Sequence, residues 1–507
     1  MTGRLILDGS SLTTEKVVSI ARDFTEIEIG VEGKENVRKG RESIERMLKT
    51  GGVYYGINTG FGKLADTVIP NADLEKLQVN LIRSHSVGVG QPFAEDEVRA
   101  IMVVRLNSLL KGYSGVSLDV IEQLQIFLNE KIYPLIPRFG SLGASGDLIP
   151  SAHLALCMIG ESYVFDNGKQ IPTRIMLQRI GIKPLSLKAK EGLSIINGTQ
   201  VMTALGCLLI HDAEISLNNM DGISAMSLEA LRAHLTPFQS RIQLIRPQEG
   251  QREVASRITK FLQDSTFVGS SRRVQDPYSL RCIPQVHGAF YDALRFARSI
   301  IANELNSVTD NPIVFSETDE IVSTGNFHGQ PVSLALDLLC ISLAEASMIS
   351  ERRIDKLLSG LNTELPLFLA AKPGLHSGLM VTQYSAAALV AQNRILAQPA
   401  SLESANVSAG QEDHASMGVN AALKGLEVLE NTLFVLAVEA VCSAQAIDVI
   451  LDKNPKLKQG IFTSILHKKI RELCPRIEAD QTLFEEIKLV AKLLRKDLGM
   501  GEFQITI

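Results

Sequence analysis

The stretch from residue 421 to residue 452 carries apolar side chains on nearly every face of a helix, with Glu427, Glu430 and Glu439 interspersed. A helix that is apolar all round must be buried on all sides, in a membrane or inside a bundle of other helices. At membrane depth each of these carboxylates would cost several kcal/mol. The stretch therefore predicts a long helix in the core of a helical bundle.

The composition of the whole chain favours the same architecture. Of the 507 residues, 45% are hydrophobic, only 5% are aromatic and none is Trp, so the core is aliphatic and typical of packed helices. The mean hydropathy of +0.12 is high for a soluble monomer and indicates burial inside a bundle or between subunits. Further helices are predicted by apolar periodicity, after a short strand at 4–7, over residues 10–22, 73–87, 95–111, 287–308 and 331–358. The predicted fold class is mainly α.

No Pro-, Ser- or Gly-rich linker, charge block or low-complexity tract divides the chain. We therefore expect one continuous compact body with two halves, residues 1–199 and residues 200–507. The first half is rich in loops, including the glycine-rich segment 51–70, and the second is a bundle of long helices.

Charge and cysteine usage exclude several classes of protein. The net charge of −5 and the pI near 6.1 offer no basic stripe for nucleic acid or an anionic membrane. Residues 1–5 contain no apolar signal region. The six cysteines are scattered without a CxxC pair, as in the reduced proteins of the cytoplasm. We expect a cytoplasmic protein that binds neither nucleic acid nor membrane.

The segment from Gly140 to Asp147 contains an Ala-Ser-Gly tripeptide in a glycine-flanked turn. Three small residues let a backbone nitrogen approach a carbonyl carbon that larger side chains would shield. The amide nitrogen of Gly146 can then attack the carbonyl of Ala144 and close a five-membered ring around Ser145. Loss of water and of the Ser145 hydroxyl leaves a conjugated methylidene, which is a strong electrophile. Taken alone, the tripeptide also fits an ordinary glycine-rich turn or an anion-binding nest.

Other loops combine small and polar residues more densely than a plain bundle requires. Taken alone, each also fits a structural role, such as a core tyrosine for Tyr55 or a surface ion pair for Arg281. His414 follows two acids, but no HExxH motif or paired His/Cys spacing supports a metal site, and we expect none. These clusters span residues 55–62, 83–90, 197–200, 275–281, 325–329 and 411–417.

Together and in this order, these clusters and the Ala-Ser-Gly turn resemble the aromatic amino acid ammonia-lyases and aminomutases. Enzymes of that family use a self-made 4-methylideneimidazol-5-one (MIO) group. The resemblance covers essentially the whole chain, and its most specific part is GSLGASGDLIPSAHLAL at 140–156. YGINTGFG at 55–62 and QDPYSLRC at 275–282 add to it. The resemblance implies an MIO group made from Ala144, Ser145 and Gly146, no dissociable cofactor, and a homotetramer whose active sites combine loops from several subunits.

The resemblance also implies roles for individual residues. Tyr55 would be the base that removes the β-proton, with helix ends and cations lowering its pKa. Arg281 would grip the substrate carboxylate. Glu412 would bind the substrate ring or take part in proton transfer, so the division of proton transfer between Tyr55 and Glu412 stays open. The catalytic set is completed by Tyr278, and the remaining substrate-binding residues are Ser84, His85, Asn197, Gln275 and Phe327.

Two segments of the family pattern favour histidine as the substrate. The pair before the Gly-Val-Gly segment, which contacts the substrate ring in the family, is Ser84-His85, as in the members that act on histidine. The late loop reads Gln411-Glu412-Asp413-His414, again as in those members. A carboxylate and a histidine suit the nitrogens of an imidazole, whereas a phenyl ring would leave the buried acid unpaired. The expected reaction is elimination of ammonia from L-histidine to give trans-urocanate.

Some points stay open in the sequence. A tyrosine or phenylalanine ammonia-lyase, or an aminomutase of the same family, is the alternative function. Either the substrate amine or its imidazole ring could attack the electrophile. The chain departs from the family pattern at Gly410, where many histidine lyases carry Asn, and at residues 246–251.

Overall fold

The computed structural model describes residues 4–270 and 273–498 of the chain. They form two compact units, each assembled from three segments. Unit 1 comprises the described residues within 1–211, 298–337 and 399–423, and unit 2 comprises those within 212–297, 338–398 and 424–507. The division predicted from the sequence places one boundary between residues 199 and 200. It differs from these two units and stays a prediction.

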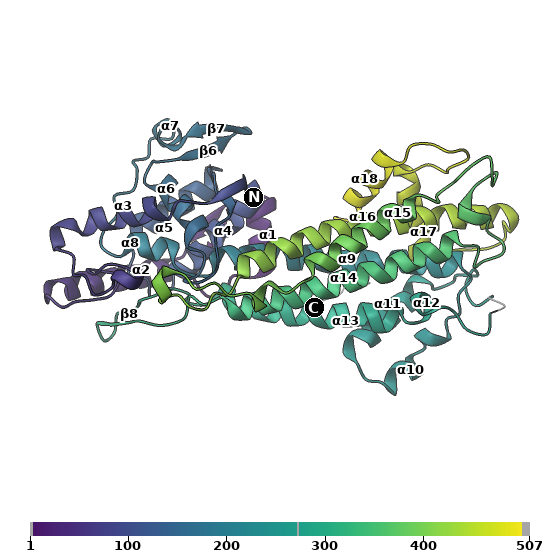
Figure 1. Cartoon of the computed structure of the whole chain (residues 1–507), viewed down its shortest axis with the longest axis horizontal. Coiled ribbons are helices and arrows are strands. Elements are labelled where there is room, and N and C mark those ends of the chain that lie inside the picture. The colour runs from purple at the N-terminus through teal and green to yellow at the C-terminus, as the bar shows by residue number, and fades with distance from the viewer. Residues whose placement is uncertain (1–3, 271–272, 499–507) are drawn as a thin grey trace. The chain divides into compact units, whose positions relative to one another are not determined.

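Among the described residues, eighteen α-helices dominate and the strands are short, which confirms the mainly α fold class (Figure 1). The helices within unit 1 are α1 (Thr14–Arg22), α2 (Val31–Lys49), α3 (Leu74–His85), α4 (Glu95–Leu109), α5 (Leu118–Asn129), α6 (Leu148–Met158), α7 (Thr173–Arg179) and α8 (Glu191–Ile196). Those within unit 2 are α10 (Ser240–Leu244), α11 (Glu249–Phe261), α12 (Tyr278–Arg281), α15 (Thr382–Leu396), α17 (Ile461–Leu473) and α18 (Phe484–Leu493). Four long helices have residues in both units: α9 (Gln200–Ala230), α13 (Ile283–Leu305), α14 (Gln330–Leu358) and α16 (Gly418–Lys453).

The strands and single-turn helices belong mostly to unit 1. In the part of the chain that the structure describes, the strands form four small sheets: a parallel pair β1–β2, antiparallel pairs β3–β5 and β8–β9, and the antiparallel sheet β4–β6–β7. Their bounds are β1 (Leu5–Leu7), β2 (Ile27–Ile29), β3 (Val89–Pro92), β4 (Tyr133–Pro134), β5 (Pro137–Phe139), β6 (Tyr163–Asp166), β7 (Lys169–Pro172), β8 (Ile313–Phe315) and β9 (Glu320–Val322). The 3₁₀ helices are η1 (Gly62–Leu64), η2 (Asn71–Asp73), η3 (Thr236–Phe238), η4 (Leu367–Leu369), η5 (Ala400–Leu402) and η6 (Ser408–Gly410).

The predicted N-terminal helix begins later than the periodicity indicated. Residues 10–12 are not helical, because the carboxylate of Asp8 accepts the amide hydrogens of Ser10 and Ser11, at 2.7 and 2.9 Å, and forms a turn. The hydroxyl of Thr13 then accepts the amide hydrogen of Lys16 and caps α1. Local hydrogen bonding by polar side chains therefore decides where this helix starts.

The core of unit 1 is built on α4, of which all but the first two residues are buried. Helix α4 packs against α1 and α5, while α3, α6 and α8 pack on one another. Two of these helices flank the Ala-Ser-Gly turn, because α6 directly follows it and Asn197 is the residue directly after α8. The turn is thus held between two packed helices of one unit.

In unit 2, segments of α9, α13, α14 and α16 lie side by side, as Figure 1 shows, and a buried polar network connects them. Asp221 on α9 accepts a hydrogen bond from His287 on α13, and Glu439 on α16 forms an ion pair with Arg353 on α14, at 2.6 Å in both cases. Helix α16 is the helix predicted over 421–452, and 83% of its most apolar window is buried. The acid Glu439 is therefore paired inside the bundle, which is how an apolar helix accommodates a charge.

By length and composition alone, α14 and α16 could each cross a membrane. Most of their apolar windows, 61% for α14 and 83% for α16, are buried within the protein itself. That burial is what core helices of a bundle show.

Candidate active site

The turn that carries the Ala-Ser-Gly tripeptide connects β5 to α6. Two of its glycines, Gly143 and Gly146, have positive φ angles of 66° and 74°. A Cβ atom on Gly146 would lie 2.2 Å from the carbonyl oxygen of Gly198, where there is no room for it. Glycine is therefore required at residue 146 both for its backbone conformation and for the close approach of a second backbone segment.

The turn is anchored by the fully buried carboxylate of Asp147. It accepts a hydrogen bond from the Ser141 hydroxyl at 3.0 Å and from the amides of Val201 and Met202, both at 2.9 Å. These two amides belong to the first turn of α9, so the carboxylate also satisfies the free N–H groups at that helix end. Burial raises the pKa of Asp147 to about 7 although these hydrogen bonds lower it. Sequence reasoning assigned no role to this residue.

Replacing Asp147 with alanine is expected to lower the melting temperature by about 3 °C or more. Three buried donors would lose their acceptor, and an unsatisfied buried donor costs about 1–3 kcal/mol. Differential scanning calorimetry of the variant against Asp413→Ala, which removes an exposed carboxylate of the same unit, provides the comparison. Equal melting temperatures for the two variants would refute the anchoring role of Asp147.

Asn197 lies directly behind the tripeptide. It caps the C-terminal end of α8, and its side-chain amide donates a hydrogen bond of 3.2 Å to the carbonyl oxygen of Ser145. Gly146 and Gly198 form a parallel bridge, and the amide of Asp147 donates to the Gly198 carbonyl at 2.7 Å. On the other side, the amide of Met417 donates to the Leu142 carbonyl at 2.8 Å. Two loops therefore fix the backbone around Ser145.

Ala144 and Ser145 line a cleft of about 690 Å³ that lies within unit 1. The cleft brings together three of the other predicted site residues, which come from loops far apart in the sequence, namely Tyr55, Phe327 and Glu412. Its remaining lining residues are Gly62, Lys63, Ala65, Asp66, Asn311, Ser323, Thr324, His328, Gln411, Asp413 and His414.

The hydroxyl of Tyr55 accepts a hydrogen bond of 3.3 Å from the amide of Gly62. Burial is the largest influence on the pKa of Tyr55 and raises it, the nearby charge of Glu412 raises it further, and the bond from Gly62 lowers it. The net direction is upward. This corrects the expectation that helix ends and cations lower this pKa, because within unit 1 burial and the charge of Glu412 outweigh the amide of Gly62.

Glu412 is held at the end of a tight loop. Val407 and Glu412 form an antiparallel bridge through hydrogen bonds of 2.9 and 3.3 Å between their backbones. Between them, Ser408, Ala409 and Gly410 all have positive φ angles, which allow the chain to reverse. Glycine suits this conformation, which gives Gly410, noted as a departure from the family pattern, a clear structural role. Burial raises the pKa of the Glu412 carboxyl.

A pair of histidines joins the loop of Phe327 to the loop of Glu412. The rings of His328 and His414 stack nearly parallel with their centroids 5.6 Å apart. His328 Nε2 lies 3.2 Å from the His414 carbonyl oxygen, and because a carbonyl can only accept, this nitrogen carries the proton. The two loops are thereby fixed at one side of the cleft.

Ser84 and His85 occupy the last turn of α3 in unit 1 and are not among the described residues that line the cleft. His85 Nδ1 lies 2.8 Å from the Leu81 carbonyl oxygen, so this nitrogen donates and Nε2 is left as an acceptor in the neutral ring. Burial lowers the pKa of His85, which favours that neutral form. Their predicted role in contacting the substrate stays a prediction.

Gln275, Tyr278 and Arg281 belong to unit 2. Gln275 and Tyr278 are exposed, and the guanidinium of Arg281 lies 4.5 Å from the centre of the Tyr278 ring. The Arg281 side chain also donates to the Asp276 carbonyl at 3.0 Å. These contacts hold Arg281 next to Tyr278 on one short segment, and their predicted roles toward substrate stay predictions.

Lys63, Asn311 and Thr324 line the cleft but were missed by sequence reasoning. The amide of Thr324 donates to Asn311 Oδ1 at 2.7 Å, which fixes the orientation of the Asn311 side chain. The Asp310-Asn311-Pro312 segment has the composition of a polar turn, which could have marked it as a functional loop. His328 stands within a cluster that was noted, although only its neighbour Phe327 received a role.

Chemically, the cleft combines a backbone turn crowded by small residues with a phenol and a carboxyl, whose pKa values are both raised. The upward shift brings the carboxyl closer to neutral pH, where it can exchange a proton with a bound molecule, whereas the phenol stays protonated until its surroundings change. Comparison with known proteins identifies the group to which this arrangement belongs. The sequence pattern of the family described as "Aromatic amino acid lyase" matches residues 12–472.

The chain belongs to the aromatic amino acid lyase family.

Its relatives in that family match over nearly the full length. The histidine ammonia-lyase of Caldanaerobacter subterraneus subsp. tengcongensis is 45% identical over 494 residues, which cover 97% of this chain and 96% of the relative. Among solved structures, the tyrosine aminomutase of Streptomyces globisporus is 37% identical with a TM-score of 0.92, covering 100% of this chain and 99% of that one. The histidine ammonia-lyase of Trypanosoma cruzi is 39% identical with a TM-score of 0.90, covering 97% and 93%. These matches confirm the resemblance inferred from the motifs and the helical lyase fold.

Proposed function

We propose that this member of the aromatic amino acid lyase family eliminates ammonia from L-histidine and releases trans-urocanate, the first step of histidine degradation. The observation that carries the proposal is the position of Glu412. This carboxyl lines the same cleft as Ser145 and Tyr55, where the ring of a bound amino acid would meet it. An imidazole offers nitrogens to a carboxyl, whereas a phenyl ring would leave it unpaired at a cost of several kcal/mol. The full-length relatives named histidine ammonia-lyase support the same substrate.

Residues 144–146 fit the MIO group. Gly146 lacks the Cβ that would collide with Gly198, and Asn197 donates to the Ser145 carbonyl oxygen. Closing the ring forms a bond between Gly146 N and the Ala144 carbonyl carbon, and two water molecules leave, from the Ala144 oxygen and the Ser145 hydroxyl. When present, the group supplies an electrophilic carbon that makes the substrate's amine a better leaving group. No dissociable cofactor is needed in addition.

The substrate's β-proton is removed by Tyr55 in this proposal. The Gly62 amide supports a phenolate by donating to its oxygen, while the charge of Glu412 opposes it. Tyr55 therefore ionises more readily when Glu412 is neutral or is paired with the substrate ring. Because the charge of Glu412 affects the ionisation of Tyr55, the protonation states of the two groups are linked. Either group can therefore hold the proton removed from the substrate at the end of this step.

The remaining predicted residues bind the substrate. Arg281 holds its carboxylate as a bidentate partner, and His85 Nε2 accepts a hydrogen bond from the imidazole N–H. Phe327 packs beside the group formed at residue 145. The other polar side chains, namely Ser84, Asn197, Gln275 and Tyr278, orient the carboxylate, the amine or the ring.

We further propose a cytoplasmic homotetramer in which subunits share active sites. Support comes from α14, where Leu338, Ile341 and Met348 are each about 40% exposed and recur at helical spacing on one face. An exposed apolar stripe of this kind is typical of subunit interfaces. In such a tetramer Arg281 of one subunit completes the cleft of another.

Substituting both Leu338 and Ile341 with aspartate is expected to dissociate the tetramer, because the carboxylates would be buried without partners in the interface. Light scattering coupled to size-exclusion chromatography measures the mass. The control is Ile175→Asp, which places the same charge on an exposed apolar residue of α7. A double variant that keeps the mass of the wild type would place the interface elsewhere.

A substrate panel tests the function itself. Purified protein is incubated separately with histidine, tyrosine and phenylalanine, and the products are followed by absorbance and chromatography. We expect urocanate and ammonia from histidine and little product from the other two. The alternative is supported by the likeness to tyrosine aminomutase. A β-amino acid product would establish an aminomutase, and coumarate or cinnamate would establish a tyrosine or phenylalanine lyase.

A further inference from the structure

At the start of α8, unit 1 contains a cluster of charged side chains that the proposed reaction does not use. Lys190, Asp310 and Arg105 are each completely buried. Lys190 Nζ lies 2.9 Å from Asp310 Oδ2. Burial lowers the pKa of Arg105 to about 10, and the charge of Asp310 opposes that effect. Removing such charges from water is costly, so a cluster like this is weak evidence for stability and calls for another explanation.

The backbone of Lys190 has a conformation that is unusual for a residue other than glycine. Its φ angle is 72°, in the left-handed region that glycine favours, and it directly precedes α8. Its ammonium makes three hydrogen bonds, to Asp310, to the Ser114 carbonyl at 3.0 Å and to the Ser194 hydroxyl at 2.9 Å. Because an ammonium has three N–H donors, all of them are used and the side chain is fixed in direction.

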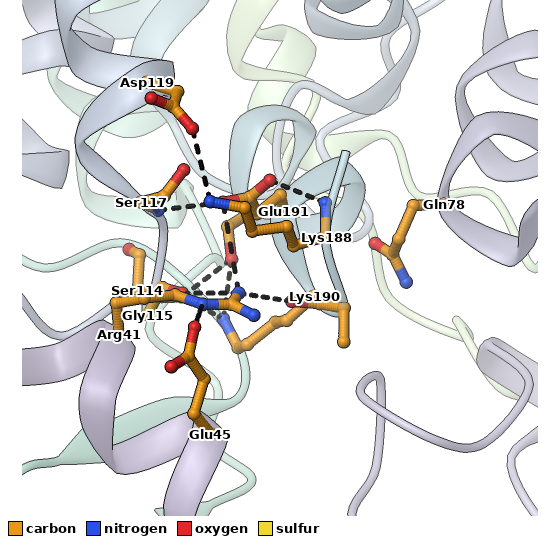
Figure 2. A network of polar contacts seen from close by, with 12 residues as sticks. Arg41, Glu45, Gln78, Ser114, Gly115, Ser117, Asp119, Lys188, Lys190 and Glu191 are labelled. Carbon is orange, nitrogen blue, oxygen red and sulfur yellow. Dashed lines mark hydrogen bonds and ion pairs between the residues drawn. The ribbon is translucent and has the colours of Figure 1, made fainter. Parts of the chain in front are cut away.

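Hydrogen bonds from other residues also hold the start of α8 in place, as Figure 2 shows. The carboxylate of Glu191 accepts hydrogen bonds from the amides of Ser117 and Lys188, at 2.8 and 2.7 Å. Gln78 Oε1 accepts from the amide of Leu193 at 3.1 Å. Helix α8 is therefore attached at its first turn to two other segments of unit 1, those of Ser117 and Gln78, and to the residues directly before it.

Both partners of the ion pair lead directly to the active site. From Lys190, α8 runs to Asn197, whose amide donates to the Ser145 carbonyl oxygen. From Asp310, the next residue is Asn311, which lines the cleft, and Asp310 Oδ1 accepts the Asn311 amide hydrogen at 2.7 Å. Asn311 in turn accepts from Thr324, a further lining residue. The ion pair thus joins the segment behind Ser145 to the segment that forms another part of the cleft.

We propose that Lys190 is a positioning residue for the reaction, whose ammonium holds the segment of Asn197, which contacts the Ser145 carbonyl, in register with the segment of Asn311, which lines the cleft. This inference rests on the proposed function, because the assay that tests it uses histidine as the substrate. In this proposal the ion pair between Lys190 and Asp310 maintains the geometry of the cleft, and stabilising the fold is not its role. Small displacements of groups that position a substrate can reduce turnover by up to about 100-fold, which sets the size of the effect.

The first test compares Lys190→Met with Lys188→Met in the full-length protein. Methionine keeps the volume of the side chain but forms none of the three hydrogen bonds. Lys188 is two residues away, and its side chain makes only a surface ion pair with Asp119. Rates are normalised to the fraction of subunits whose 144–146 peptide has lost two water molecules, measured by mass spectrometry. We expect kcat to fall about 10-fold or more in Lys190→Met, with a smaller change in KM, and to stay unchanged in Lys188→Met.

The second test separates positioning from stability with the double variant Lys190→Met/Asp310→Asn. The side-chain carbonyl introduced at residue 310 can still accept the Asn311 amide hydrogen, while Arg105 loses the charge of Asp310. Rates are measured well below the melting temperature of each variant, and we expect the normalised kcat of the double variant to stay low there, so that the deficit does not follow from unfolding. A double variant with wild-type kcat, or a single variant that loses only thermal stability, would overturn the proposal.

The experiments also distinguish an error in the proposed function from an error in the role of Lys190. If the wild type shows no activity on histidine but acts on another amino acid of the panel, the assignment of substrate is wrong. The same variants are then measured with that substrate, and the same kcat deficit is expected. The assignment of histidine as the substrate and the positioning role of Lys190 can therefore fail independently.

Discussion

Replacing Ser145 with alanine is expected to leave a folded protein of wild-type size with almost no turnover of histidine. Alanine has no hydroxyl to eliminate, so no methylidene can form, and the amine remains a poor leaving group. We expect kcat to fall by about 1,000-fold or more, which corresponds to about 4 kcal/mol of lost transition-state stabilisation. Stopped assays of urocanate formation over hours measure a rate this low.

The matched control is Ser464→Ala, which removes an exposed serine hydroxyl on α17 and is expected to keep full activity. Circular dichroism and size-exclusion chromatography are expected to show that the Ser145→Ala variant folds, since Ser145 is only partly buried and the turn is anchored by the hydrogen bond between Ser141 and Asp147. A Ser145→Ala variant with near-normal rates would show that the electrophile is not formed at this residue.

Replacing Glu412 with glutamine is expected to reduce kcat/KM for histidine by about 100-fold or more, the range in which general acid–base groups contribute. Glutamine keeps the shape of the side chain but can neither carry charge nor exchange a proton. Glu403→Gln is the control, because it neutralises an exposed carboxylate of the same segment that is not among the residues lining the cleft. A near-normal rate in Glu412→Gln would weaken histidine as substrate and leave the reaction class intact.

The pH profile tests the same residue. Burial raises the pKa of Glu412, so this carboxyl takes up its proton at a higher pH than an ordinary glutamate, with its reference value of 4.5. Where the carboxylate is the active form, kcat/KM of the wild type falls as the pH decreases through that raised value. The acidic limb of the profile then lies above pH 4.5, and it is expected to disappear in Glu412→Gln.

The sequence predicted those features that depend on local chemistry. The apolar stretch at 421–452 lies within α16 and is mostly buried, because a helix without a polar face is stable in a bundle only when other helices cover it. The requirement for glycine at residue 146 also followed from the tripeptide, although its cause includes the close approach of Gly198, which only the fold reveals. Tyr55, Phe327 and Glu412 were named from loops far apart and line one cleft.

Features that depend on contacts between distant segments were not predicted. Nothing local marks Asp147 as the acceptor for the first turn of α9, since the amides it binds lie more than fifty residues away. The raised pKa of Tyr55 arises from burial and from Glu412, neither of which the neighbouring residues encode. The same holds for Lys190 and Asp310, which form a buried pair across 120 positions of sequence.

Mass spectrometry of the peptide that contains residues 144–146 tests the central claim most directly. Protein purified in active form and digested under mild conditions is expected to give a peptide lighter by two water molecules than its sequence requires, and the Ser145→Ala variant is expected to lack that loss. An unmodified peptide mass in fully active protein would contradict the account.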